Sequence, residues 1–252
     1  MTRVHAGGRT FAIEAVVFDK DGLLFKSKAF WIALAEERLK QIRYIAGAGA
    51  VQSWADCFGV KTEDGISVSD VDATGIMAVA SPAEEMTATA ALLVQALGLS
   101  WTQAREQAFA IFQKADEQLD LRRALQPQKG FPQIMERLRE KGIPYGVATS
   151  DTTERVIHSF RLFDDPDALA FIISPREVSR GKPYPDMLER IASQLQVPLG
   201  RLLMVGDSYV DVQMAHSAGA IGIGIPETEE MRRQMLDWDA VIVDSLEQIF
   251  FE

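Results

Sequence analysis

The sequence predicts an α/β fold: a doubly wound parallel sheet whose chain is interrupted, after the first strand, by a helical insertion. Two observations carry this prediction. Short apolar runs alternate with stretches of helical period along most of the chain, and a long interval after the first run holds helical patterns without a convincing buried strand. Continuous apolar runs are typical of strands buried on both faces, and their alternation with helices is typical of parallel sheets.

The strands of the sheet are expected at short runs that are apolar without alternation. These predicted strands are residues 15–18, 145–149, 171–173, 202–205, 221–225 and 240–243.

Helices are expected between most of these strands, with recognisable end signals. The helix that follows residue 130 should end with Gly142 as its C-cap, and the helix after Asp207 should stop at Gly219. Asp151, followed three residues later by Glu154, is typical of a helix start. These signals place one helix before the 145–149 strand, one after it, and one after the 202–205 strand.

The interval from 26 to 128 is predicted to be an all-helical domain. Residues 28–44, 82–97 and 102–125 have helical patterns, and residues 62–75 are expected to form a loop. We therefore divide the chain into a sheet domain, 1–25 with 129–252, and the helical insertion 26–128.

Composition sets limits on the environment and the partners. The 252 residues are 47% hydrophobic and carry a formal net charge of −10, which excludes global disorder and argues against a nonspecific nucleic-acid binder. No apolar run approaches the roughly 18 residues that span a bilayer, and residues 1–10 lack the apolar core of a secretory signal. We expect a cytoplasmic protein without a membrane or nucleic-acid partner; its oligomeric state is left open. His5 is interpreted as part of a tail, and the lone Cys57 as a small buried hydrophobe.

Two pairs of acidic residues follow predicted strands. Asp19 and Asp21 come directly after the first strand, and Asp207 and Asp211 follow the fourth, one helical turn apart. Ligands of open α/β sheets bind at the carboxyl ends of the strands. Two close carboxylates repel one another, which favours a bound cation or separate roles.

Two other strand ends carry groups suited to an anion. Thr149 and Ser150 offer hydroxyl groups just before a predicted helix, and Lys182 lies in a Gly-Lys-Pro turn after the 171–173 strand. Each of these pieces alone is typical of a helix cap or a turn. Their joint occurrence at four strand ends favours a single site.

In this order, the residues resemble the four motifs of the haloacid dehalogenase superfamily of phosphotransferases. The matching segments are Asp19-Lys20-Asp21-Gly22, Thr149, Lys182 in Gly-Lys-Pro-Tyr-Pro-Asp, and Gly206-Asp207-Ser208-x-x-Asp211. The chain looks most like the phosphoglycolate phosphatase and β-phosphoglucomutase branch of that superfamily. The insertion lies where this branch carries a C1-type helical cap, with hinges expected near 25–27 and 126–130.

The resemblance implies a magnesium-dependent phosphatase acting on a small phosphorylated metabolite. Asp19 would be the nucleophile that forms an aspartyl-phosphate, and Asp21 the general acid and then base. The Asp19 carboxylate, the Asp21 carbonyl and the Asp207 carboxylate would hold Mg²⁺, supported by Asp211.

The resemblance also implies that Thr149, Ser150 and Lys182 bind the phosphoryl oxygens. Lys20 stands where an apolar residue is usual; its side chain is expected to point away from the nucleophile because neighbouring strand residues alternate, so we give it no catalytic role.

Several alternatives remain open from the sequence. Asp21 favours a phosphate ester over a carbon–halogen bond, because the dehalogenases of the superfamily lack this acid. A sugar-phosphate mutase would keep the same acids, and a catalytically idle protein would use the insertion as a binding surface. The substrate is not specified by these residues.

Overall fold

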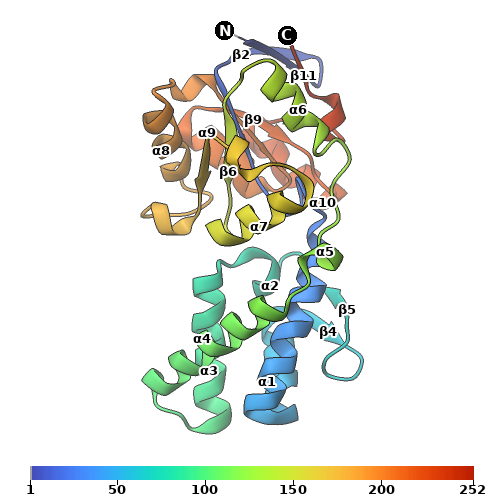
Figure 1. The fold of residues 1–252 in the computed structure, drawn as a ribbon, viewed down its shortest axis with the longest axis vertical. Helices are drawn as coiled ribbons and strands as arrows, with labels where there is room; N and C mark the ends of the chain where they lie inside the picture. The colour runs from blue at the N-terminus through green and yellow to red at the C-terminus, as the bar shows by residue number, and fades with distance from the viewer. Residues whose placement is uncertain (1) are drawn as a thin grey trace. The chain divides into compact units, whose positions relative to one another are not determined.

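The computed structural model describes residues 2–252 and divides into two compact units. The sheet unit consists of the chain up to Lys26 and from Pro127 to Glu252, and the helical unit is Ser27–Gln126. Figure 1 shows the sheet unit built from both ends of the chain, and the helical unit from the blue-to-green stretch between them.

The sheet unit contains, within residues 2–252, a six-stranded parallel sheet in the order β10-β9-β8-β3-β6-β7. Its strands are β3 (Ala15–Phe18), β6 (Tyr145–Ala148), β7 (Phe171–Ile173), β8 (Leu202–Gly206), β9 (Ile221–Gly224) and β10 (Val241–Ile242). The predicted parallel sheet and its six strands are confirmed.

The strand order places β3 in the interior of the sheet, between β8 and β6. Phe18, the last residue of β3, pairs with Val205 on one side and Val147 on the other. The chain runs outward from β3 to β6 and β7, then returns to β8 on the other side. The carboxyl ends of β3 and β8 therefore meet at a topological switch point, where doubly wound sheets bind ligands.

Helices cover both faces of this sheet. They are α6 (Gln133–Glu140), α7 (Thr153–Phe163), α8 (Asp186–Leu195), α9 (Tyr209–Ala218) and α10 (Glu229–Met235). Apolar side chains of α8 and α9, including Leu188 and Met214, are buried in one core with Val17 and Met204 of the sheet. Strand side chains alternate, so Phe18 points to the opposite face.

The helix ends agree with the sequence signals, with one correction. Gly142 and Gly219 have positive φ just after α6 and α9, as predicted. The N-cap of α7 is Thr152, whose hydroxyl accepts a hydrogen bond from the Arg155 N–H, and not Asp151. The Asp151 side chain instead pairs with Lys20 and Arg155.

A second, antiparallel sheet joins the two ends of the chain and was not predicted. Within the described residues its order is β11-β1-β2, with β1 (Thr2–Ala6), β2 (Arg9–Ile13) and β11 (Phe250–Phe251). The interpretation of His5 as part of a tail is wrong, because His5 pairs with Thr10 in the hairpin and with Phe250 of β11. The Gly7-Gly8 pair, where both residues have positive φ, is a local signal for this hairpin that the prediction did not include, whereas β11 comes from the far end of the chain.

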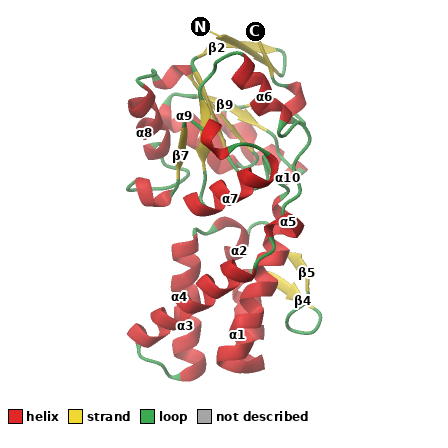
Figure 2. Cartoon of the chain, in the orientation of Figure 1, coloured by secondary structure: helices red, strands yellow, loops and turns green. Residues whose placement is uncertain are grey.

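The helical unit is predominantly helical, as predicted (Figure 2). Its helices are α1 (Ser27–Phe58), α2 (Ile76–Val79), α3 (Pro82–Leu97), α4 (Trp101–Gln118) and α5 (Leu121–Ala124). The helices depart from the prediction at two places: the helix expected over 28–44 continues to Phe58 past a break at Gly47, and the one expected over 102–125 divides into α4 and α5. Cys57, expected to be buried, is exposed.

The expectation that the insertion is all-helical is wrong. β4 (Val60–Thr62) and β5 (Val68–Val71) form an antiparallel ribbon, and β5 lies in the predicted loop 62–75. Strands this short have too few residues to show an alternating pattern in the sequence. In the structure both strands pack against α1.

The helical unit buries an ion pair in its core. Arg38 of α1 is fully buried and pairs with Glu85 of α3, while its guanidinium lies 4.0 Å from the Phe112 ring centroid. Trp54 stacks on the ring of Phe58, one helical turn further along α1. These contacts join α1, α3 and α4 within one unit.

No helix in the part of the chain that the structure describes combines the length and apolar character that crossing a membrane requires.

Candidate active site

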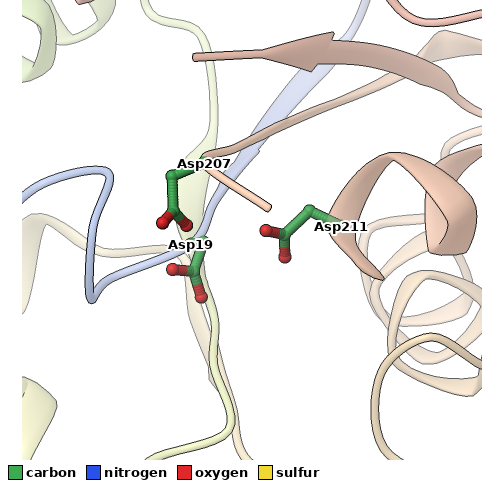
Figure 3. Close-up of side chains that lie close together, drawn as sticks. All are labelled: Asp19, Asp207 and Asp211. Carbon is green, nitrogen blue, oxygen red and sulfur yellow. The ribbon is translucent and has the colours of Figure 1, made fainter. Parts of the chain in front are cut away.

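Three carboxylates converge at the carboxyl ends of β3 and β8 (Figure 3). Asp19 follows β3 and is fixed to β8 by a hydrogen bond from its N–H to the Val205 carbonyl, at 2.9 Å. Asp207 follows β8, and Asp211 lies in the first turn of α9. Each of the three is buried, and each offers an oxygen within 4.8 Å of the others. We call Asp19, Asp207 and Asp211 the acid cluster.

Two glycines make room for the acid cluster. A Cβ at Gly22, where φ is +97°, would lie 1.9 Å from Oδ2 of Asp207. A Cβ at Gly206 would lie 2.2 Å from the Asp211 Cβ. The glycines of the first and fourth motifs are therefore needed because their backbones lie directly against the carboxylate-bearing side chains.

Lys182 lies between two members of the acid cluster. Its Nζ is 2.5 Å from Oδ1 of Asp19 and 2.6 Å from Oδ1 of Asp211, and its side chain is almost fully buried. Burial alone would lower the pKa of Lys182, but the two carboxylates raise it above its usual value. The lysine therefore remains charged at the site.

The acid cluster carries more negative charge than Lys182 balances. Burial, with the neighbouring Asp211, raises the pKa of Asp19 to about 7 despite the opposing effect of Lys182. Burial, Asp19 and Asp211 raise the pKa of Asp207 well above its usual value. Three carboxylates and one ammonium leave two formal negative charges, and buried charges of this kind require pairing. The excess and the all-oxygen donor set fit a divalent cation such as Mg²⁺.

Thr149 follows β6, the strand next to β3, and is buried. Its N–H donates to the Ile173 carbonyl, which fixes it to β7, and its Oγ1 accepts a hydrogen bond from the Asp151 N–H at 3.0 Å. Ser150 follows and is half-buried. The predicted phosphate-binding residues thus lie at the same edge of the sheet as Asp19.

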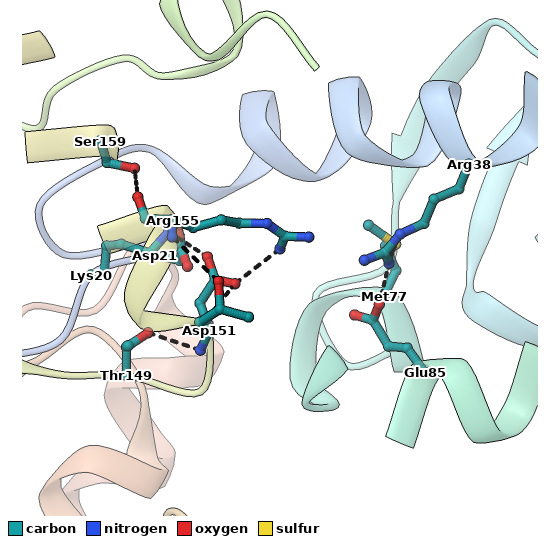
Figure 4. A network of polar contacts seen from close by, with 10 residues as sticks. Lys20, Asp21, Arg38, Met77, Glu85, Thr149, Asp151, Arg155 and Ser159 are labelled. Carbon is teal, nitrogen blue, oxygen red and sulfur yellow. Dashed lines mark hydrogen bonds and ion pairs between the residues drawn. The ribbon is translucent and has the colours of Figure 1, made fainter. Parts of the chain in front are cut away.

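The side chain of Asp21 turns to a different set of charges (Figure 4). Nζ of Lys20 lies 2.6 Å from Oδ1 of Asp21 and 2.9 Å from Oδ2 of Asp151. Nη1 of Arg155, in α7, lies 2.9 Å from Oδ1 of Asp151. We call these four residues the Lys20 network. As expected, Lys20 pairs with residues other than Asp19. Its partners are Asp151 and Asp21, and Asp21 is the predicted general acid and base.

Sequence reasoning missed Asp151, Arg155 and a second pair of residues, Gln128 and Glu227, near the acid cluster. Gln128 donates from Nε2 to the Gly22 carbonyl, at 2.9 Å, and to Oε1 of Glu227, at 2.7 Å. The Glu227 charge also raises the pKa of Asp207. Lys20, which lies between two acids in the first motif, was the available signal, because a buried lysine there needs a carboxylate partner such as Asp151. The sequence carried no signal for Gln128.

Comparison with protein families places this site in a known context. The model of a family described as haloacid dehalogenase-like hydrolase matches residues 13–219 of the chain. That interval includes every member of the acid cluster and of the Lys20 network, and Lys182.

Among characterised relatives, the phosphoglycolate phosphatase of Escherichia coli strain K12 is 31% identical over 98 residues. The matched segment covers 38% of this chain and 39% of that enzyme, so less than half of either protein is compared.

Solved structures share the fold over nearly the whole chain. A protein of Bacteroides fragilis described as a haloacid dehalogenase-like hydrolase has a TM-score of 0.63 at 17% identity, covering 94% of this chain and 99% of that one. A β-phosphoglucomutase of Clostridium difficile has a TM-score of 0.58 at 16% identity, covering 94% and 92%. At these identities the likeness shows the fold alone.

Proposed function

Because the chain belongs to the haloacid dehalogenase-like hydrolases, we propose that it is a magnesium-dependent phosphatase acting on a small phosphorylated metabolite. The observation that carries the proposal is the acid cluster with Lys182 between two of its members. Phosphoryl transfer needs a positioned nucleophile and positive charge around the transferring group. A buried carboxylate beside a buried lysine, at the switch point of the sheet, meets both needs.

In the proposed reaction Asp19 is the nucleophile. Its carboxylate oxygen forms a bond to phosphorus while the ester P–O bond breaks, and Asp21 gives a proton to the leaving oxygen. Water then attacks phosphorus, the bond to Asp19 breaks, and Asp21 takes up the proton that water releases. Phosphate leaves and both carboxyl groups return to their starting states.

Other residues bind and orient. The ammonium of Lys182 neutralises charge on the phosphoryl oxygens, and Asp211 holds Lys182 in place through the ion pair at 2.6 Å. Thr149 and Ser150 are proposed to donate hydroxyl hydrogen bonds to the same oxygens. The Asp19 and Asp207 carboxylates, with the Asp21 carbonyl, would hold Mg²⁺, which supplies the positive charge that the acid cluster lacks.

We propose that the helical unit serves as the cap. The chain passes into it and out of it at adjacent points of the sheet unit, because Phe25 pairs with Pro127 and the Gln128 N–H donates to the Leu24 carbonyl. Two adjacent connections are suited to a hinge, and closure of a cap would exclude water from the first step.

The test is phosphate release from a panel of phosphorylated metabolites in the presence of Mg²⁺. We expect wild-type protein to release phosphate from one chemical class, with loss of activity in Asp19→Asn and after thorough chelation. Asp56→Asn, which removes a charge from an exposed position of α1, is the matched control and should stay active. Equal, slow release by wild type and Asp19→Asn from the whole panel would refute the phosphatase. Isomer formation without net phosphate release would identify a mutase.

A further inference from the structure

Lys20 occupies an unusual position for a lysine, with its side chain fully buried directly beside a reacting carboxylate. Burying a lysine is costly unless its charge is paired. Here the ammonium contacts Asp21 on one side and Asp151 on the other, at 2.6 and 2.9 Å. The residue that the first motif places between Asp19 and Asp21 therefore joins the site to the α7 region of the sheet unit.

Asp151 is itself held from several directions. Arg155, one helical turn further on, contacts its Oδ1, and the Thr152 N–H also donates to that oxygen at 2.8 Å. Its own N–H donates to Oγ1 of Thr149. Burial would raise the pKa of Asp151, but Lys20 and Arg155 lower it to about 2, so this carboxylate remains charged. Asp151 is thus a fixed anchor for Lys20.

Asp21 is the most exposed member of the Lys20 network. The side chain of Lys20, between the two carboxylates, is 0% exposed, that of Asp151 6%, that of Arg155 10% and that of Asp21 18%. The Asp21 carboxylate therefore lies at the open end of a network whose other members are buried. This order suits a device that presents one carboxylate in a set orientation.

The formal charges of the network also differ from those of the acid cluster. When Asp21 is ionised, the two cations Lys20 and Arg155 face two carboxylates, Asp21 and Asp151, so the formal charges of these four residues cancel. The acid cluster with Lys182 keeps an excess of two negative charges. Two carboxylates separated by one residue in the sequence, Asp19 and Asp21, therefore have different ion-pair partners, Lys182 and Lys20.

We propose that Lys20, anchored by Asp151 and Arg155, is a positioning residue that holds the Asp21 carboxylate in the orientation from which it exchanges a proton with the leaving oxygen. The proposal rests on the proposed phosphatase function. Lys20 touches neither substrate nor Asp19 in this assignment, and acts through Asp21. A misplacement of about 1 Å in a reacting group lowers rates by about two orders of magnitude.

The predicted signature is a dependence on the leaving group. Phenyl phosphate releases a poor leaving group that needs the Asp21 proton, whereas 2,4-dinitrophenyl phosphate releases one that does not. With Lys20→Met, formation of the aspartyl-phosphate from phenyl phosphate should slow by about 100-fold. Its formation from the dinitrophenyl ester, measured as a pre-steady-state burst of dinitrophenol, should change by less than about threefold. Steady-state turnover should fall with both esters, because water attack needs Asp21 in either case.

Three further variants keep the test decisive. Lys20→Arg, which retains the cation, should recover much of the phenyl phosphate burst rate. Asp151→Asn, which retains Lys20 but weakens its anchor, should show the same selectivity with a smaller loss, and serves if Lys20→Met does not fold. Arg139→Met is the matched control, since it removes a cation from an ion pair with Asp164 elsewhere in the sheet unit. It should leave both bursts unchanged.

The outcomes separate this inference from the proposed function. An equal loss with both esters in Lys20→Met, or no loss with either, would overturn the positioning role while the phosphatase stands. Failure of wild-type protein to form an aspartyl-phosphate from either ester would overturn both.

Discussion

The ion pair in the core of the helical unit and the acid cluster of the sheet unit bury charge in opposite ways. The helical unit buries Arg38 with Glu85, so one cation meets one anion and the guanidinium packs on the Phe112 ring. The sheet unit buries the acid cluster with Lys182, which leaves an excess of negative charge at the ends of β3 and β8. A buried pair whose formal charges cancel is complete in charge, whereas a buried cluster with excess negative charge either takes up protons or binds a cation. Excess charge therefore marks where a cation is expected. Balance by itself does not exclude a role in the chemistry, because the Lys20 network is balanced as well.

The largest expected effect comes from removing the cation of the unbalanced cluster. In Lys182→Met, turnover with Mg²⁺ should fall by about 10³-fold, because the phosphoryl oxygens lose a buried positive charge. Without metal, the variant should also lose about 3 to 5 kcal/mol of unfolding free energy, because Asp19 and Asp211 lose their buried partner. Steady-state kinetics and denaturation in chelator measure the two effects.

Lys129→Met is the control for this variant, since Lys129 pairs with Glu247 at the surface of the same unit. It should retain both turnover and stability. A Lys182→Met enzyme within tenfold of wild-type turnover would remove Lys182 from the site.

Breaking the Arg38–Glu85 pair should lower the unfolding free energy by a similar amount and leave turnover unchanged. Arg38→Met leaves the buried Glu85 carboxylate without its guanidinium partner, and we expect a loss of about 3 to 5 kcal/mol in urea denaturation. The double variant Arg38→Met/Glu85→Leu replaces both charges with apolar groups and should recover most of that loss. If the double variant were as unstable as the single one, Arg38 would stabilise by packing rather than by charge.

In the metal-free protein, the acid cluster and the Lys20 network should also make opposite contributions to the pH dependence of stability. Asp19 has a folded pKa of about 7, above its ordinary value of 3.8, so the folded state binds more protons between these values. The unfolding free energy should therefore fall, by a few kcal/mol, as pH rises from about 4 to about 7. Asp151, with a folded pKa of about 2, contributes fully above its ordinary pKa and loses its contribution only as pH falls through about 2.

Thermal or urea denaturation between pH 4.5 and 7.5 measures this slope, in chelator and in Mg²⁺. Mg²⁺ should flatten it by balancing the acid cluster, and Asp207→Asn should flatten it without metal. A slope that is the same in chelator and in Mg²⁺ would show that the acid cluster does not bind the cation.

The parallel sheet and the residues at its strand ends were predictable because their signals are local. A buried strand is a continuous apolar run, and three of the four motifs follow one such run directly, while Lys182 follows β7 after residues 174–181. Helix ends at Gly142 and Gly219 were predictable for the same reason, since a left-handed C-cap favours glycine.

The features that were missed include contacts between distant parts of the chain and short local elements. β11 pairs with β1 across almost the full sequence, whereas the β1–β2 hairpin and the β4–β5 ribbon join neighbouring residues in strands of three to five residues. Asp151 has the local pattern of a helix start, and only its contacts with Lys20 and Arg155 reveal its actual place. Local patterns located the acid cluster, Asp21 and Lys182, but not Asp151 and Arg155, which pair in the Lys20 network.

The smallest expected effect concerns a glycine of the helical unit. Gly47 interrupts α1 with φ 78° and ψ 179°, and a Cβ built there meets no atom within 4 Å. Gly47→Ala should therefore cost only backbone strain, about 1 to 3 kcal/mol of unfolding free energy, with Mg²⁺ affinity unchanged. Gly22, which also has positive φ, lies against Asp207, so Gly22→Ala should additionally weaken Mg²⁺ binding in isothermal titration. Equal Mg²⁺ affinities in the two variants would show that the close approach of Gly22 to Asp207 is not needed for the metal, and that both glycines serve the backbone alone.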